Sequence, residues 1–97
     1  MTDNSVSRFD HDETGFASWL TAHPTGFVVN TTRSVPANYR VLHRSTCWTI
    51  RPGRKGATPG AFTERAYIKI CSSDLSFLKS AIGPLSRSCS ICDAPNL

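Results

Sequence analysis

The sequence lacks the long apolar run that a membrane-spanning helix requires. Such helices take roughly 20 consecutive apolar residues, and no stretch of this chain approaches that length. The first residues, Met1 to Ser5, are polar and acidic, and no apolar segment follows them. The sequence therefore predicts neither a transmembrane helix nor a secretory signal peptide, and we expect a cytoplasmic protein.

Common signatures of enzymes are also missing. The chain has no glycine-rich phosphate motif, and its 97 residues are too few for a Rossmann domain with a substrate lobe, a barrel or a P-loop fold. It shows no carboxylate pair at a useful spacing and no Ser/His/Asp constellation. We therefore expect a monomeric, non-enzymatic chain with a disordered N-terminus over residues 1–8 and one domain over residues 9–97.

Cysteines are few, but they are grouped. The spacings are H-x3-C in His43-Arg-Ser-Thr-Cys47 and C-x2-C in Cys89-Ser-Ile-Cys92. In a reducing cytosol, grouped cysteines bind metal more often than they form disulfides. A C-x2-C turn aims two sulfurs at one point, and one imidazole with three thiolates is a common tetrahedral zinc set. The sequence therefore predicts one structural Zn²⁺ held by His43, Cys47, Cys89 and Cys92.

Three alternatives to this zinc site remain open at the level of sequence. The cysteines could form disulfides, or Cys89 and Cys92 could be a redox pair. Cys71 could also replace His43 as the fourth ligand, although a lone cysteine in a strand is usually a small buried apolar residue.

Two helices are expected from the apolar spacing. Phe16, Trp19 and Leu20 recur on one helical stripe after Asp10-x-x-Glu13, which resembles a capping box, and His23-Pro24 ends that helix. A second helix follows the N-cap candidates Ser72 to Asp74, carries Leu75, Leu78 and Ile82, and ends at Gly83-Pro84.

Strands are expected where β-branched and aromatic residues cluster. The expected strands are Phe27–Asn30, Tyr39–His43, a short one at Cys47–Ile50, and Tyr67–Cys71. In the last of these, alternation puts Tyr67, Lys69 and Cys71 on one face. Together these elements predict an α+β fold with a small antiparallel sheet of three to four strands and two helices.

Positive charge is concentrated in the middle of the chain. Lys and Arg number 11 against 7 acidic residues, and eight of the basic residues lie between Arg33 and Lys69, with Glu64 as the one acid among them. Aromatic residues are interleaved with these cations, a pattern that suits phosphate pairing and base stacking. The candidate nucleic-acid contacts are Arg40, Arg44, Arg51, Arg54, Lys55 and Arg65, several of them in a basic loop over residues 51–65 that we expect to be mobile.

The expected partner is therefore DNA or RNA. The alternative is a zinc-stabilised module that binds a protein through one of the two apolar helices. No membrane contact and no small-molecule substrate are expected.

The order of these motifs resembles the N-terminal zinc-binding domain of bacterial Ada-type DNA-repair proteins. In that pattern a strand leads into C-x3-C or H-x3-C, a further strand and a short helix follow, and a C-x2-C closes the domain. Here the matching stretch runs from Phe27 to Cys92. The resemblance implies an Ada-like zinc domain in a bacterial protein. The methyl-accepting thiolate of that family falls at the position of His43, so the resemblance does not imply alkyl transfer.

Overall fold

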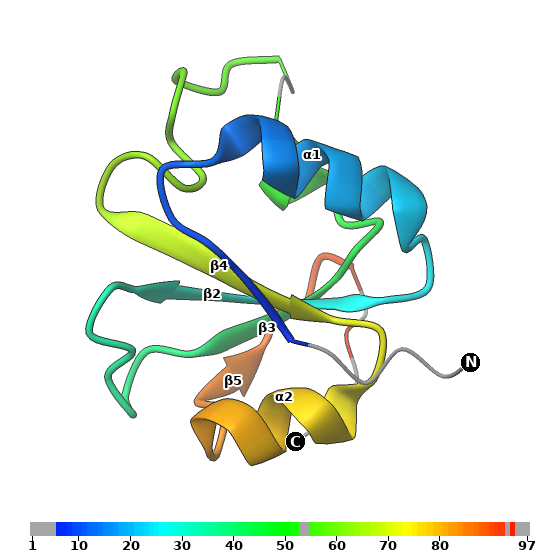
Figure 1. The fold of residues 1–97 in the computed structure, drawn as a ribbon, viewed down its shortest axis with the longest axis vertical. Helices are drawn as coiled ribbons and strands as arrows, with labels where there is room; N and C mark the ends of the chain where they lie inside the picture. Colours follow the sequence, from blue (N-terminus) through cyan, green and yellow to red (C-terminus); the bar gives the residue numbers. More distant parts are fainter. Residues whose placement is uncertain (1–5, 53–54, 93, 95–97) are drawn as a thin grey trace.

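A five-stranded mixed sheet lies between two helices in the computed structural model, which describes residues 6–52, 55–92 and 94 (Figure 1). The elements are β1 (Ser7–Phe9), α1 (Glu13–Ala22), β2 (Phe27–Thr32), β3 (Val41–Arg44), the 3₁₀ helix η1 (Trp48–Ile50), β4 (Tyr67–Ser72), α2 (Leu75–Ile82) and β5 (Arg87–Ser88). The strand order is β1-β4-β2-β3-β5. The predicted α+β class with two helices is confirmed.

The sheet differs from the expected one at both edges. Residues 1–8 were expected to be disordered, but β1 pairs antiparallel with β4, Ser7 opposite Cys71, and so covers an edge that would otherwise expose unpaired backbone groups. Residues 1–5 lie outside the described part. At the other edge β5 runs parallel to β3, with Leu42 opposite Ser88. The expectation of a purely antiparallel sheet of three to four strands is therefore wrong.

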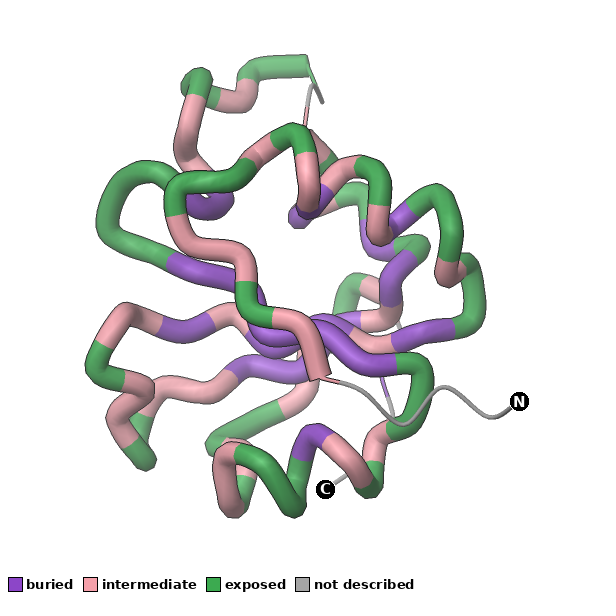
Figure 2. Tube along the Cα trace, viewed as in Figure 1, coloured by how far each residue is buried: buried purple, intermediate pink, exposed green. Residues whose placement is uncertain are grey.

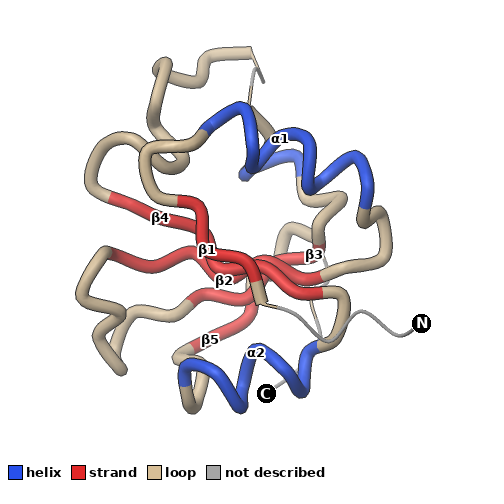
Figure 3. The backbone as a smooth tube through the Cα atoms, viewed as in Figure 1, coloured by secondary structure: helices blue, strands red, loops and turns tan. Residues whose placement is uncertain are grey.

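The two faces of the sheet pack against different helices (Figure 3). Alternate residues of β2, β3 and β4, namely Val29, Leu42, Ile68 and Ile70, are buried with Leu78 of α2. The opposite set includes Val28 and Cys71, which are buried with Phe16 and Leu20 of α1. Burial is concentrated in the strands, while the outward sides of both helices are exposed (Figure 2). We refer to these as the α2 face and the α1 face.

The start of α1 differs from the expected capping box. Asp12, not Asp10, is the N-cap, and its carboxylate accepts the backbone N–H of Gly15 at 2.9 Å. Asp10 instead accepts from Nε of Arg33 at 2.8 Å. Arg33 also donates to the carbonyl of Thr63. The long-range ion pair therefore takes the carboxylate that the local pattern had assigned to the helix.

The segment after Cys47 is the 3₁₀ helix η1, so the expected short strand at Cys47–Ile50 is wrong. Its turn is closed by local bonds, from Ile50 N to Cys47 O and from Arg51 N to Trp48 O, both 3.4 Å long. The later residues of loop 51–65 are anchored, since Phe62 and Thr63 are buried and Thr63 Oγ1 accepts from the backbone of Asp12. That the loop is mobile stays a prediction.

Both ends of α2 follow the expected pattern. Asp74 caps its start through Ser76 N at 2.8 Å. Gly83 ends it with a φ of 87°, a conformation that glycine adopts without steric cost. The turn then leads through Pro84 into β5, which places the C-terminal cysteines.

Candidate metal centre

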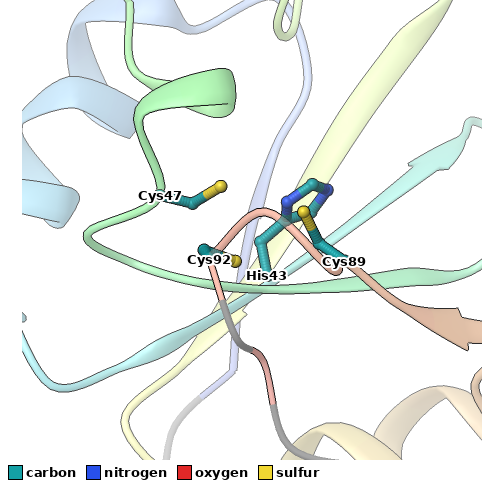
Figure 4. Close-up of side chains that lie close together, drawn as sticks. All are labelled: His43, Cys47, Cys89 and Cys92. Carbon is teal, nitrogen blue, oxygen red and sulfur yellow. The ribbon is translucent and has the colours of Figure 1, made fainter.

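Four side chains from two distant segments converge at one end of the sheet (Figure 4). His43 lies in β3 and Cys47 just after it, whereas Cys89 follows β5 and Cys92 is three residues further on. One ligand atom from each of these residues lies within 4.8 Å of every other. These are the four residues that the sequence indicated, and the cluster could hold a metal ion.

The parallel strand β5 brings the two halves together. Backbone pairing sets Ser88 beside Leu42, and the N–H of Cys89 donates to the carbonyl of Leu42 at 2.8 Å. Cys89 is thereby fixed beside His43, the residue after Leu42. On the other side, the N–H of Cys47 donates to the carbonyl of Arg44 at 3.0 Å, which folds the H-x3-C segment into a tight turn. Strand β5 was not predicted, because two residues make no recognisable pattern.

Backbone N–H groups point at two of the sulfurs. The N–H of Arg44 donates to Sγ of Cys92 at 3.4 Å. Burial alone would raise the pKa of Cys89, but backbone N–H groups of Cys92 and Ile91, with the thiols of Cys92 and Cys47, lower it below the ordinary value. Hydrogen bonds of this kind stabilise the anionic form of a thiol. The C-x2-C turn therefore favours the thiolate form of Cys89.

Cys92 and Cys47 have different surroundings. Burial raises the pKa of Cys92 to about 12, and the neighbouring Cys47 and Cys89 add to that rise because adjacent thiolates repel one another. A divalent cation would relieve this repulsion. Sγ of Cys47 also lies 2.9 Å from Oγ1 of Thr49.

His43 supplies a buried nitrogen with no hydrogen-bond partner. Its side chain is buried, and Nδ1 contacts no donor or acceptor among the described residues. Burial, with the positive charges of Lys69 and Arg87, lowers its pKa to about 4. The imidazole is therefore neutral at physiological pH, which is the form that binds metal. A buried polar atom without a partner is costly, and coordination would remove that cost.

The structure bears on two of the three alternatives left open by the sequence, and a redox role of Cys89 and Cys92 stays a hypothesis. Cys71 is fully buried beside Phe16 and Leu20, burial raises its pKa, and it lies outside the cluster. All four cysteines are free thiols. His43 is therefore the fourth member of the group, and Cys71 belongs to the core.

The basic residues predicted to contact nucleic acid have different surroundings in the structure. Arg40 is used internally, since its guanidinium donates to the carbonyls of Val35 at 2.7 Å and Pro84 at 3.1 Å. Arg65 donates to the carbonyl of Pro59. Arg44 is half-buried beside the cluster, Arg51 and Lys55 are exposed, and Arg54 lies outside the described residues.

Several residues around the cluster were not predicted. Trp48 and Ile91, each next to a cysteine of the cluster, are 59% and 60% exposed. Arg87 and Thr49 line a cavity of about 290 Å³ that also reaches His43 and Cys89. Alternation in the predicted strand had placed Lys69 on the same face as Cys71. Arg87 lay outside the predicted elements, so no local pattern pointed to it.

Comparison with known proteins returned no match to a family model, a curated protein or a solved structure. The likeness to the Ada-type domain therefore rests on motif spacing. No helix within the described residues has the length and hydrophobicity needed to cross a membrane.

Proposed function

We propose that this chain is a zinc-stabilised binding module whose metal is held by His43, Cys47, Cys89 and Cys92. The observation that carries the proposal is the convergence of four ligand atoms, one from each residue, within 4.8 Å of one another. Buried Nδ1 of His43, which has no hydrogen-bond partner among the described residues, supports it. In a tetrahedral site with Zn–S bonds of about 2.3 Å, neighbouring sulfurs lie about 3.8 Å apart. Binding therefore requires the cluster to contract by about 1 Å at most.

The donor set favours zinc over other common metals. Thiolate and imidazole ligands suit Zn²⁺, while Mg²⁺ and Ca²⁺ take oxygen ligands. Three thiolates, a neutral imidazole and Zn²⁺ together carry one net negative charge. Lys69 and Arg87, the two cations that lower the pKa of His43, would offset that negative charge. Four protein ligands leave no open position, so the metal is structural. Free thiols of this kind suit a reducing compartment such as the cytosol.

The metal would stabilise the fold by joining distant segments. It connects the turn after β3 to the C-x2-C segment, and the chain beyond that segment reaches Ala94, which is buried on the α2 face. Because a preformed site rarely exists in an unfolded chain, metal-binding energy is folding energy.

We propose nucleic acid as the partner of the surface that surrounds the metal. Arg51 and Arg87 are exposed and supply positive charge that can pair with phosphates. Trp48 is exposed and supplies a ring on which an accessible base can stack. Arg40 fits this role less well, because its guanidinium already donates to the carbonyls of Val35 and Pro84.

Titration of a fluorescent oligonucleotide with the zinc-loaded chain tests this partner. We expect binding that weakens steeply between about 50 mM and 200 mM salt, because counterions are released from phosphates. Absence of binding, or binding indifferent to salt, would refute the nucleic-acid role and leave the zinc site standing.

A protein partner is the second candidate, favoured by the exposure of Trp48 and Ile91. It predicts a salt-insensitive complex that is lost in Trp48→Ala. The helices named at the level of sequence fit this role less well, since Phe16 and Leu20 of α1 and Leu78 of α2 are buried.

A further inference from the structure

Two cavities adjoin on the α1 face of the sheet. Each has a volume of about 290 Å³, and they share Asn30 and Thr49 in their walls. The first lies over β3 and β5 and reaches His43 and Cys89 of the metal centre. The second lies over β2 and β4, below Gly56–Ala61 of the loop. The shared residues place the two cavities side by side between the metal centre and Lys69, and we refer to the pair as the groove.

The walls of this groove are rich in hydrogen-bond donors and contain a cation at each end. Arg87 lines the first cavity and Lys69 the second, and hydroxyls come from Thr49, Ser88 and Ser90. Among the described residues that line either cavity there is no aspartate or glutamate. A groove of this composition selects for a ligand that is anionic and rich in acceptors.

Lys69 is a charged group held inside the protein. It is 2% exposed, and Nζ donates to Oδ1 of Asn30 at 2.7 Å and to the carbonyl of Phe62 at 2.6 Å. Among the described residues it forms no ion pair. Burial lowers its pKa to about 8, so the ammonium remains mostly charged at neutral pH. The negative charge of Glu13 opposes part of this decrease, and Nζ lies 5.7–6.0 Å from the ring centroids of Phe16, Phe62 and Tyr67. The ammonium is therefore held by two hydrogen bonds and by aromatic rings rather than by a direct ion pair.

Aromatic rings border the same groove. Tyr39 lines the first cavity and Tyr67 the second, and their ring centroids lie 5.8 Å apart. Tyr67 is 39% exposed. Nδ2 of Asn30 donates to the hydroxyl of Tyr39 at 3.1 Å, so the amide links the tyrosine edge to Lys69. The border thus offers a planar apolar surface beside the two cations.

From these observations we infer that the groove binds one nucleotide of a single strand, with its phosphate at Arg87 and its base in the cavity above Asn30 and Lys69. Arg87 is exposed, where a guanidinium can pair with a solvated phosphate. Lys69 and Asn30 line the second cavity, where their N–H groups can meet the acceptor edge of a base. Each cavity is smaller than most drug-like ligand sites, so each has room for only part of a nucleotide. The inference rests on the proposed nucleic-acid function and narrows it, because a base within a duplex cannot enter a cavity.

Fluorescence anisotropy of labelled oligonucleotides with the zinc-loaded chain tests the inference. A mixed-sequence single strand and the matching duplex are compared. We expect at least tenfold tighter binding of the single strand. In Arg87→Gln, affinity for the single strand should fall about tenfold, and the slope of log affinity against log salt should shrink by about 0.7, the value for one phosphate contact.

A second variant probes the base cavity without removing its packing. Asn30→Asp has the same shape and keeps an acceptor for Lys69, so the fold should persist, but it places a carboxylate where the base edge would lie. We expect at least a tenfold loss of affinity with an unchanged melting temperature or a higher one. Lys79→Gln is the matched control, since Lys79 is exposed on α2, on the opposite side of the sheet, and its side chain makes no described contact. It should bind like the wild type.

The outcomes separate this inference from the broader function. If the wild type binds, Arg87→Gln and Asn30→Asp bind equally well, and Arg51→Gln loses affinity, the groove is wrong and the nucleic-acid function survives. Equal affinity for duplex and single strand would also overturn the groove. Displacement of the strand by an equal concentration of nucleoside monophosphates would make free nucleotides the ligand. No binding of any oligonucleotide would refute both proposals.

Discussion

The two faces of the sheet differ in chemistry although the same strands build them. The α2 face is aliphatic, with Val29, Leu42, Ile68 and Ile70 packed on Leu78. The α1 face carries an apolar cluster around Phe16, but it also buries His43 and Lys69. Because residues alternate along a strand, each functional side chain has an aliphatic neighbour that points the other way. One face therefore secures the strands while the other can carry costly polar groups.

The largest effect is expected at the metal centre, which the α1 face carries. Removing zinc by chelation, or by Cys89→Ser, should abolish the cooperative thermal transition, because structural zinc sites contribute about 10–16 kcal/mol and small domains are stable by about 5–15 kcal/mol. Calorimetry with and without a chelator measures the effect. An unchanged melting curve after complete chelation would contradict a structural metal.

Truncation of the α2 face should weaken the fold without altering the metal centre. Leu78 is fully buried, so Leu78→Ala is expected to cost about 3 kcal/mol. Urea denaturation of the zinc-loaded protein measures that loss, and metal analysis should still find the wild-type zinc content. Loss of zinc in this variant would show that the two faces are not independent.

Burial of Lys69 should give the α1 face a dependence on pH. Its pKa falls from 10.5 to about 8 on folding, because burial disfavours the charged form. The unfolded chain then binds more protons between these values, so stability rises as pH increases from about 8 to 10.5, by at most about 3 kcal/mol.

Lys69→Met provides the control for that pH dependence. Urea denaturation of the zinc-loaded wild type and variant across this range should show a rise in the wild type and a flatter curve in the variant. Parallel curves would mean that Lys69 is not the titrating group.

The helix cap on the α1 side should have the smallest effect. Asp12→Ala removes the acceptor for Gly15 N and is expected to cost about 1 kcal/mol. Asp12→Asn keeps an acceptor and should lose only part of that. Urea denaturation of both variants measures the loss of unfolding free energy. An equal loss in the two variants would mean that the hydrogen bond to Gly15 N is not its cause.

Local patterns were sufficient for much of the fold and for the four residues of the His/Cys cluster. The apolar stripe through Phe16 and Leu20, the alternation from Tyr67 to Cys71 and the spacing of the two metal pairs each depend on residues close in sequence. Such patterns survive folding because periodicity determines which side chains share a face.

Long-range contacts account for the features that the sequence did not predict correctly. Asp10 was assigned to a helix cap but pairs with Arg33, and Arg40 was assigned to nucleic acid but donates to the carbonyls of Val35 and Pro84. The two-residue strand β5 exists only because β3 offers it a backbone partner. Each of these outcomes depends on a neighbour distant in the chain, which no local pattern contains.

Native mass spectrometry of the intact protein, purified under reducing conditions, tests the central claim most directly. We predict a mass that exceeds the chain by one zinc ion in the wild type and a chain without metal in Cys89→Ser. A wild-type mass equal to that of the bare chain, or lower by two hydrogens for each disulfide formed, would contradict the metal centre on which the account depends.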